Sequence, residues 1–202
     1  MSDPELEIRG VVLHREETGE NFLRLTLFGP QGLRRCLLRK VRKLTAILPP
    51  DLFDEIEIAL QKKNPQGLPF AREHLVLQKR MPLALDRTRF DAAGFLARFY
   101  IENGEHLLDA HEFYRILQNA LSSLEDHGHP PTVLLKTLFL FAREEGLPVK
   151  ESWFSGLSAE FAGVALSILR LPVKESSNLN DQAPVLLDSL SHWLRSETEL
   201  RC

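Results

Sequence analysis

The sequence predicts an α+β protein in which a small closed β-barrel is followed by an all-α helical domain. Two patterns of apolar residues predict this class. In the first 80 positions apolar residues alternate with polar ones, as at Leu23, Leu25 and Leu27, whereas beyond Phe90 they recur every three or four positions. The 202-residue chain is 44% hydrophobic, so both parts have enough apolar side chain to bury a core.

The barrel is expected to contain about five short strands, a number that suits a small closed barrel. Turn-forming residues separate the strands, among them the Gly29 to Gly32 stretch and the pair Pro49-Pro50. The expected strands are residues 7–15, 20–29, 33–42, 51–61 and 73–80.

The spacing of apolar residues changes from strand-like to helix-like near Pro82. This change predicts a barrel domain of residues 1–82 and a helical domain of residues 83–202. The helix that Pro130 opens is expected to stop before Gly146, because proline favours helix starts and glycine favours the position after the end. Ser158 and Asp181 are the expected N-caps of the last two helices. Residues 172–184 are the expected long loop.

Positive charge is concentrated in the barrel half. Six of the ten residues from 34 to 43 are basic in a chain of net charge −3, and residues 31–90 carry a net +7 against −7 for residues 91–202. A local positive field of this kind most often attracts a polyanion such as nucleic acid. The alternative is a solvated basic edge strand, because lysine and arginine also block edge-to-edge aggregation. The expected DNA-binding residues are Arg34, Arg35, Arg39, Lys40, Arg42 and Lys43, aided by Lys62, Lys63, Lys79 and Arg80.

Aromatic side chains in the sequence give little further support for nucleic-acid binding. A ring that stacks on a base contributes about 1–3 kcal/mol. The barrel half has four phenylalanines, and at their spacing on strands barrel core is the more common role. None of Phe22, Phe28, Phe53 and Phe70 is therefore assigned to DNA.

No catalytic, cofactor or metal motif is complete. His111-Glu112 begins like a zinc-protease helix, yet Arg115 stands where the second histidine is needed. The His127-Gly128-His129 sequence suits a plain turn better than a metal site. We find no phosphate-binding Gly-rich loop and no hydrolase elbow around Ser155. The sequence therefore predicts a protein that is not an enzyme and binds no cofactor or metal.

The chain is expected to be cytoplasmic. Its acidic start lacks the basic and apolar regions of a signal peptide, and no stretch approaches the roughly 18 apolar residues that a membrane span needs. Its two cysteines, Cys36 and Cys202, fit a reducing compartment.

The barrel half begins with Ile8-Arg9-Gly10-Val11-Val12-Leu13 and continues with a Gly-Glu turn and an alternating strand over residues 18–28. These segments resemble the first strand, and the Gly-Glu turn with the second strand, of the RecO family of bacterial recombination and repair proteins. Arg39-Lys40-Val41-Arg42-Lys43 occupies the place of the family's Lys-Gly-Ala-Arg-Arg run, with Lys40 where the family has glycine. The cysteine zinc module of many members is absent.

The resemblance implies an OB-fold, a five-stranded Greek-key barrel, joined to a helical domain. It implies a non-enzymatic mediator of recombinational DNA repair that binds single- and double-stranded DNA and anneals strands. The implied partners are a RecR-like protein and the C-terminal tail of single-strand binding protein, with RecA loading as the outcome. The alternative is a protein-interaction adaptor on the same scaffold that has lost DNA binding.

Overall fold

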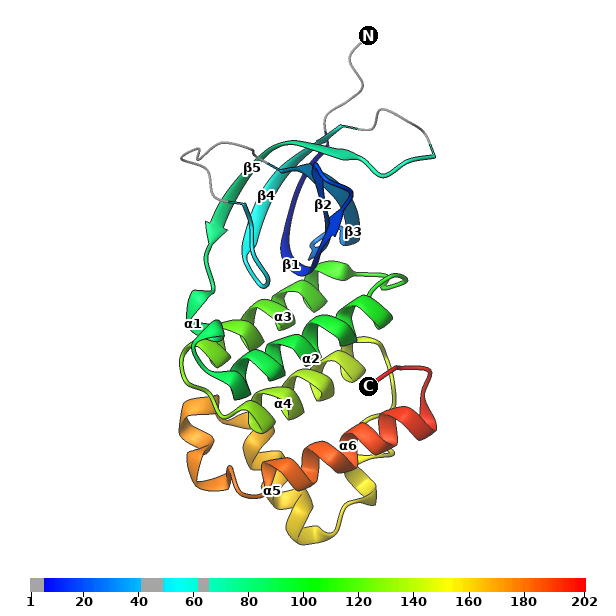
Figure 1. The fold of residues 1–202 in the computed structure, drawn as a ribbon. Helices are drawn as coiled ribbons and strands as arrows, with labels where there is room; N and C mark the ends of the chain where they lie inside the picture. The colour runs from blue at the N-terminus through cyan, green and yellow to red at the C-terminus, as the bar shows by residue number, and fades with distance from the viewer. Residues whose placement is uncertain (1–5, 41–48, 62–65) are drawn as a thin grey trace. The chain divides into compact units, whose positions relative to one another are not determined.

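The computed structural model describes residues 6–40, 49–61 and 66–202 (Figure 1). Five strands form a closed barrel in the N-terminal part, and the rest of the described chain is helical, which confirms the predicted fold class. The strands are β1 (Leu6–Thr18), β2 (Phe22–Gly29), β3 (Gly32–Arg39), β4 (Glu55–Gln61) and β5 (Phe70–Gln78).

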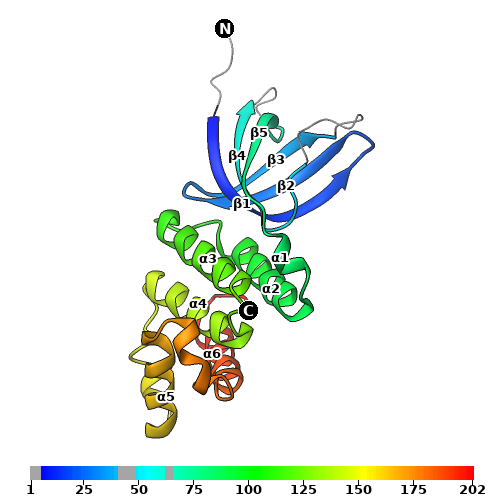
Figure 2. The same cartoon turned by 90° about the vertical axis from the view of Figure 1, so that its left-hand side faces the viewer.

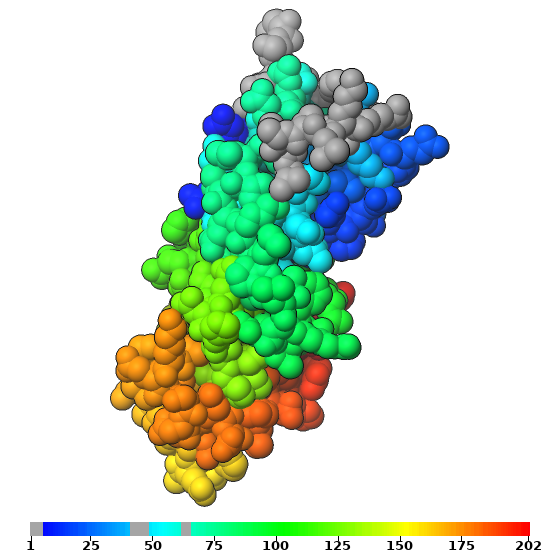
Figure 3. All heavy atoms as spheres, turned by 60° about the vertical axis from the view of Figure 1, so that its left-hand side comes forward, coloured from blue at the N-terminus to red at the C-terminus, as the bar shows by residue number. Residues whose placement is uncertain are grey.

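The strands follow one another around the barrel in the order β1-β2-β3-β5-β4, and β4 closes the barrel by pairing with β1 (Figure 2). Four of the five pairings are antiparallel, and β3 with β5 is the parallel one. That parallel seam is short, because only Leu37 and Leu38 pair with Phe70 and Ala71. Strand β5 lies on the surface shown in Figure 3, and none of its nine residues is fully buried.

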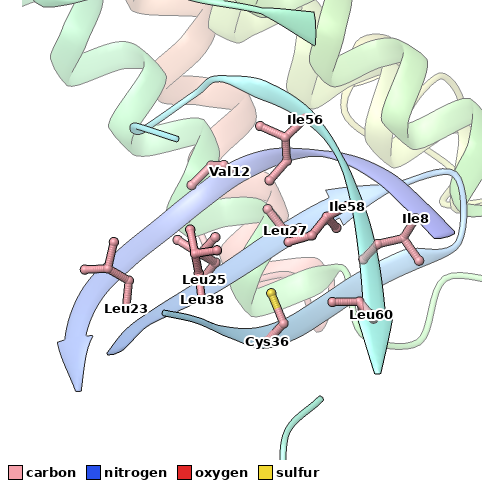
Figure 4. Packing of buried hydrophobic residues seen from close by; sticks show 10 residues of the cluster. All are labelled: Ile8, Val12, Leu23, Leu25, Leu27, Cys36, Leu38, Ile56, Ile58 and Leu60. Atoms are coloured by element: carbon pink, nitrogen blue, oxygen red, sulfur yellow. The ribbon is translucent and has the colours of Figure 1, made fainter. Parts of the chain in front are cut away.

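The barrel interior is aliphatic, and alternate residues of the strands converge on it (Figure 4). None of the four barrel-half phenylalanines belongs to this cluster, so the expected core role is confirmed only in that Phe28 and Phe53 are buried. Phe28 and Phe53 are buried elsewhere, and Phe22 and Phe70 are half-buried. The cluster consists of Ile8, Val12, Leu23, Leu25, Leu27, Cys36, Leu38, Ile56, Ile58 and Leu60.

Strands β1 and β2 approach each other so closely at Gly29 that only glycine fits there. A Cβ added at Gly29 would lie 1.8 Å from the carbonyl oxygen of Arg9, well inside van der Waals contact. The pairing also shifts register between Val12 and His14, a bulge that bends the long first strand. The close approach at Gly29 and the bulge together curve β1 enough to close the barrel.

The contacts within the chain define two compact units, and residues 100–114 belong to the same unit as residues 1–81. Phe28 points out of the barrel and packs edge-on against Tyr100, with ring centroids 4.9 Å apart. Tyr114 donates a hydrogen bond of 2.6 Å to Glu55 of β4. This segment therefore covers apolar and charged groups on the outer face of the barrel.

The second unit consists of residues 82–99 and 115–202. Helix α4 packs against α6, as Figures 1 and 2 both show. No described helix is both long and apolar enough to cross a membrane. The helices are α1 (Met81–Ala84), α2 (Arg87–Asn103), α3 (Ala110–Glu125), α4 (Pro130–Glu144), α5 (Ala159–Arg170) and α6 (Ala183–Glu197), with 3₁₀ helices η1 (Phe154–Gly156) and η2 (Val173–Leu179).

The helix ends test the expected caps. Ser158 is the N-cap of α5 and accepts a 3.3 Å hydrogen bond from the backbone N–H of Phe161, as predicted. Gly146 follows the end of α4 with φ of +80°, again as predicted. The expected cap at Asp181 is wrong, because Gln182 takes that place. Much of the expected loop 172–184 is the 3₁₀ helix η2, so the prediction of a long loop there is also wrong.

Candidate functional site

A hollow of about 500 Å³ lies at one end of the barrel. The β1–β2 turn, the start of β2, the end of β3, the end of β4 and the start of β5 all reach it. In OB-folds the β1–β2 and β4–β5 loops flank the surface that binds oligonucleotides or oligosaccharides. The hollow is lined by Asn21, Phe22, Arg39, Gln61, Phe70, Ala71 and Arg72.

Two arginines reach the hollow from different strands. Leu38 pairs with Ala71 in the parallel seam, so Arg39 and Arg72 each follow at the same level of the barrel. Both residues are exposed. Among the residues that the structure describes, no carboxylate pairs with Arg39. The hollow therefore has a cationic side that the strand order creates from residues 33 positions apart.

Two aromatic rings form another side of the hollow. Phe22 and Phe70 lie with ring centroids 5.6 Å apart at an interplanar angle of 62°, an edge-to-face pair. Phe22 pairs with Arg39 across β2 and β3, and Phe70 pairs with Gln61 across β4 and β5. The sheet register thus places a ring beside a cation at this end of the barrel.

Lys40 lies at the same end but is already paired. Its ammonium is 2.9 Å from the carboxylate of Glu17, and its backbone N–H donates to the carbonyl of Asn21 at 2.7 Å. The hydrogen bond from Lys40 and its charge lower the pKa of Glu17. Surface ion pairs contribute little to stability, so Lys40 can leave Glu17 for another anion.

Arg34 and Arg35 lie near the β2–β3 turn, at the opposite end of β3 from Arg39. Arg34 and Arg39 are five positions apart along the strand, or about 16 Å. Arg35 forms an ion pair of 2.9 Å with Glu105, and Arg34 donates to the carbonyl of Leu33. The structure therefore does not bring these two arginines to the hollow.

Lys79 and Arg80 donate hydrogen bonds to a buried carboxylate. Asp54 is 2% exposed and accepts hydrogen bonds from the Lys79 ammonium at 2.7 Å and the backbone N–H of Arg80 at 3.3 Å. The Arg80 side chain is itself buried. Both residues hold the strand end in place, which is a structural role.

The remaining four predicted DNA-binding residues, Arg42, Lys43, Lys62 and Lys63, lie outside the described residues. Sequence reasoning missed Arg72 and gave Phe22 and Phe70 a core role. These three gather only because β5 pairs with β3, and a parallel pairing of two residues leaves no pattern in the sequence.

A second hollow, of about 460 Å³, lies within the helical unit between α4 and α5. Its floor is apolar, with Phe139, Leu140, Phe154, Leu166 and Leu169, and four cations line it: Lys136, Arg143, Lys150 and Arg170. The Lys136 ammonium donates to three carbonyl oxygens at the end of α5, those of Ile168, Leu169 and Leu171. Arg143 pairs with Glu144. Within the described part of the chain, no carboxylate pairs with Lys150 or Arg170.

The described residues include no group of three or more His, Cys, Asp or Glu side chains arranged to hold a metal ion. His129 instead lies 3.0 Å, Nδ1 to Oγ1, from Thr132 at the start of α4. Burial raises the pKa of the Cys36 thiol to about 12, so that sulfur stays protonated and unreactive.

No family model matches the chain, and a search of curated proteins found no match.

Proposed function

We propose that the protein binds DNA through the end of the barrel that carries Arg39 and Arg72, and acts as a RecO-like mediator of recombinational DNA repair. In this role it binds single- and double-stranded DNA, anneals complementary strands in the cytoplasm, and works with a RecR-like protein to load RecA. It performs no chemistry of its own.

One observation carries the proposal: two arginines and two phenylalanines meet beside the loops that OB-folds use for oligonucleotides. Arginine binds phosphate bidentately, and aromatic rings stack on bases without regard to sequence. The order of motifs along residues 8–60 supports the choice of family.

Ion pairs within the protein reduce the number of cations that are available to bind DNA. Arg35, Lys79 and Lys40 each lie within 3 Å of a carboxylate, so the basic segment is less positive than its sequence suggests. The proposal rests on Arg39 and Arg72 because they line the hollow, with Lys40 joining once a phosphate displaces Glu17. Annealing requires only such a cationic surface, which lowers the repulsion between two phosphate chains.

Fluorescence anisotropy with a labelled oligonucleotide tests the proposal. Binding should weaken steeply with salt, because each neutralised phosphate adds about 0.7 to 0.9 to the slope of log affinity against log salt. The double variant Arg39→Glu, Arg72→Glu should bind weakly and with a smaller slope. Arg34→Glu changes the charge of the same strand at its other end, and should bind almost as the parent does. Equal losses in the two variants would refute this placement.

The second hollow is our proposed site for the tail of single-strand binding protein. The apolar floor is lined also by Lys150 and Arg170, for which the described residues supply no carboxylate, and this combination suits an acidic tail that carries an apolar side chain. The double variant Lys150→Glu, Arg170→Glu should lose the tail peptide and keep DNA. If the parent binds this peptide but no DNA at low salt, the protein is the adaptor rather than the mediator.

A further inference from the structure

Phe22 and Phe70, at the end of the barrel, lie outside its buried core. The barrel interior is filled by aliphatic side chains and contains neither Phe22 nor Phe70. Rings that merely plugged the barrel would be buried, yet both remain half-exposed and line a hollow. Exposed aromatic surface of this kind beside cations is the usual composition of a site for unpaired bases.

The hollow is large enough to take a nucleobase. Its volume of about 500 Å³ falls within the range of about 300–1,000 Å³ typical of small-molecule sites. Because Phe22 and Phe70 meet edge to face, they leave no gap for a base between them, and a base would stack against the exposed part of one half-buried ring. Arg39 and Arg72 stand beside the rings, where the phosphates flanking such a base would lie.

We propose that this hollow captures a single unpaired nucleobase, stacked on Phe22 or Phe70, while Arg39 and Arg72 hold the phosphates on either side of it. This inference rests on the proposed function and names its preferred substrate, a single strand. A base in a duplex must first be unpaired and unstacked before it can enter, so the hollow selects against duplex DNA.

Base capture also gives annealing a direction. A captured base is withheld from pairing until a complementary strand competes for it, and pairing then removes it from the hollow. The single strand is held and the finished duplex is released, because the duplex retains only the phosphate contacts.

The first experiment uses the parent protein. Its affinity for an oligothymidylate is compared with that for a strand of equal length in which every base is removed, at one salt concentration. Stacking of one base predicts about tenfold tighter binding of the strand with bases. Equal affinities would overturn base capture and leave the DNA-binding proposal intact. If neither strand binds at low salt, the proposed function itself fails.

The second experiment uses the double variant Phe22→Leu, Phe70→Leu, which keeps apolar volume and removes the rings. Its single-strand affinity should fall about tenfold, with duplex affinity and the salt slope unchanged. The double variant Arg39→Glu, Arg72→Glu is the matched comparison, and should weaken both substrates. Equal loss for single strand and duplex in the leucine variant, or no loss, would overturn the inference. A 2-aminopurine in the strand should change its fluorescence on binding to the parent and not to the leucine variant.

Discussion

The hydroxyl of Tyr114 donates a 2.6 Å hydrogen bond to Oε1 of Glu55, which lies 59 positions earlier in the chain. The same carboxylate oxygen accepts a second bond, of 2.5 Å, from Nε of Arg9. Glu55 is only 3% exposed, and a buried carboxylate is stable only when such donors replace its water. One carboxylate thereby connects β1, β4 and the start of α3.

Removal of the Tyr114 hydroxyl, which donates to a charged carboxylate, should cost more stability than removal of a hydroxyl that donates to a neutral acceptor. Tyr114→Phe is expected to lower the free energy of unfolding by about 1.5–3 kcal/mol, since its acceptor is charged. Tyr100→Phe is the matched control, because its buried hydroxyl donates to the neutral carbonyl of Phe113 at 2.9 Å; the expected loss is about 1 kcal/mol. Urea unfolding measures both. Equal losses would show that the charge of Glu55 adds nothing.

Glu55 should also make stability depend on pH. Burial acts to raise its pKa, but the hydrogen bonds from Tyr114 and Arg9 and the charge of Arg9 outweigh it, so the pKa lies below 4.5. With a lowered folded-state pKa, the stabilisation is complete above 4.5 and is lost as the pH falls through the folded value. The stability difference between the parent and Glu55→Gln should therefore shrink as the pH falls below 4.5. A constant difference in unfolding experiments across pH would contradict this assignment.

Two glycines should respond oppositely to alanine. At Gly29 the added methyl would meet the Arg9 carbonyl, so Gly29→Ala must displace backbone and should cost about 3 kcal/mol or more. Gly163 lies exposed within α5 with nothing within 4 Å of an added Cβ, so Gly163→Ala should gain about 0.5–1 kcal/mol from helix propensity. Thermal unfolding followed by circular dichroism compares them; a neutral Gly29→Ala would mean that β1 and β2 need not approach so closely.

The cap of α5 offers a local test in the helical unit. Ser158→Ala removes the acceptor for the Phe161 N–H and should reduce the free energy of unfolding by about 1 kcal/mol. Ser158→Asp keeps an acceptor and should behave like the parent. If both variants lose the same amount in urea unfolding, the cap hydrogen bond does not stabilise the helix.

Much of the fold could be predicted from the sequence because its signals are local. Alternation over β2 and the proline and glycine that flank α4 each describe one element, and both predictions are confirmed. The Asp181 cap failed for a local reason as well: Pro184 fixes the helix start two residues later and leaves Asp181 outside.

The site was less predictable because it depends on contacts between distant residues. Clustered charge pointed to Arg39, which lines the hollow, yet it gave equal weight to Arg35 and Lys79, whose carboxylate partners, Glu105 and Asp54, lie 70 and 25 positions away. Nothing in the sequence indicates that Arg72 joins Arg39. Charge density counts cations, whereas only the fold reveals which of them are neutralised.

The brevity of the β3–β5 seam has a thermodynamic consequence. In the described strands the two are joined by two residue pairs, beside the hollow, with the Leu37 amide donating to the Pro69 carbonyl at 2.9 Å. A ligand bound there touches both strands where they meet, so occupancy and barrel closure are linked equilibria. Bound ligand should therefore slow hydrogen exchange at the Leu37 amide. Opening of the β3–β5 seam should in turn limit the rate of ligand release.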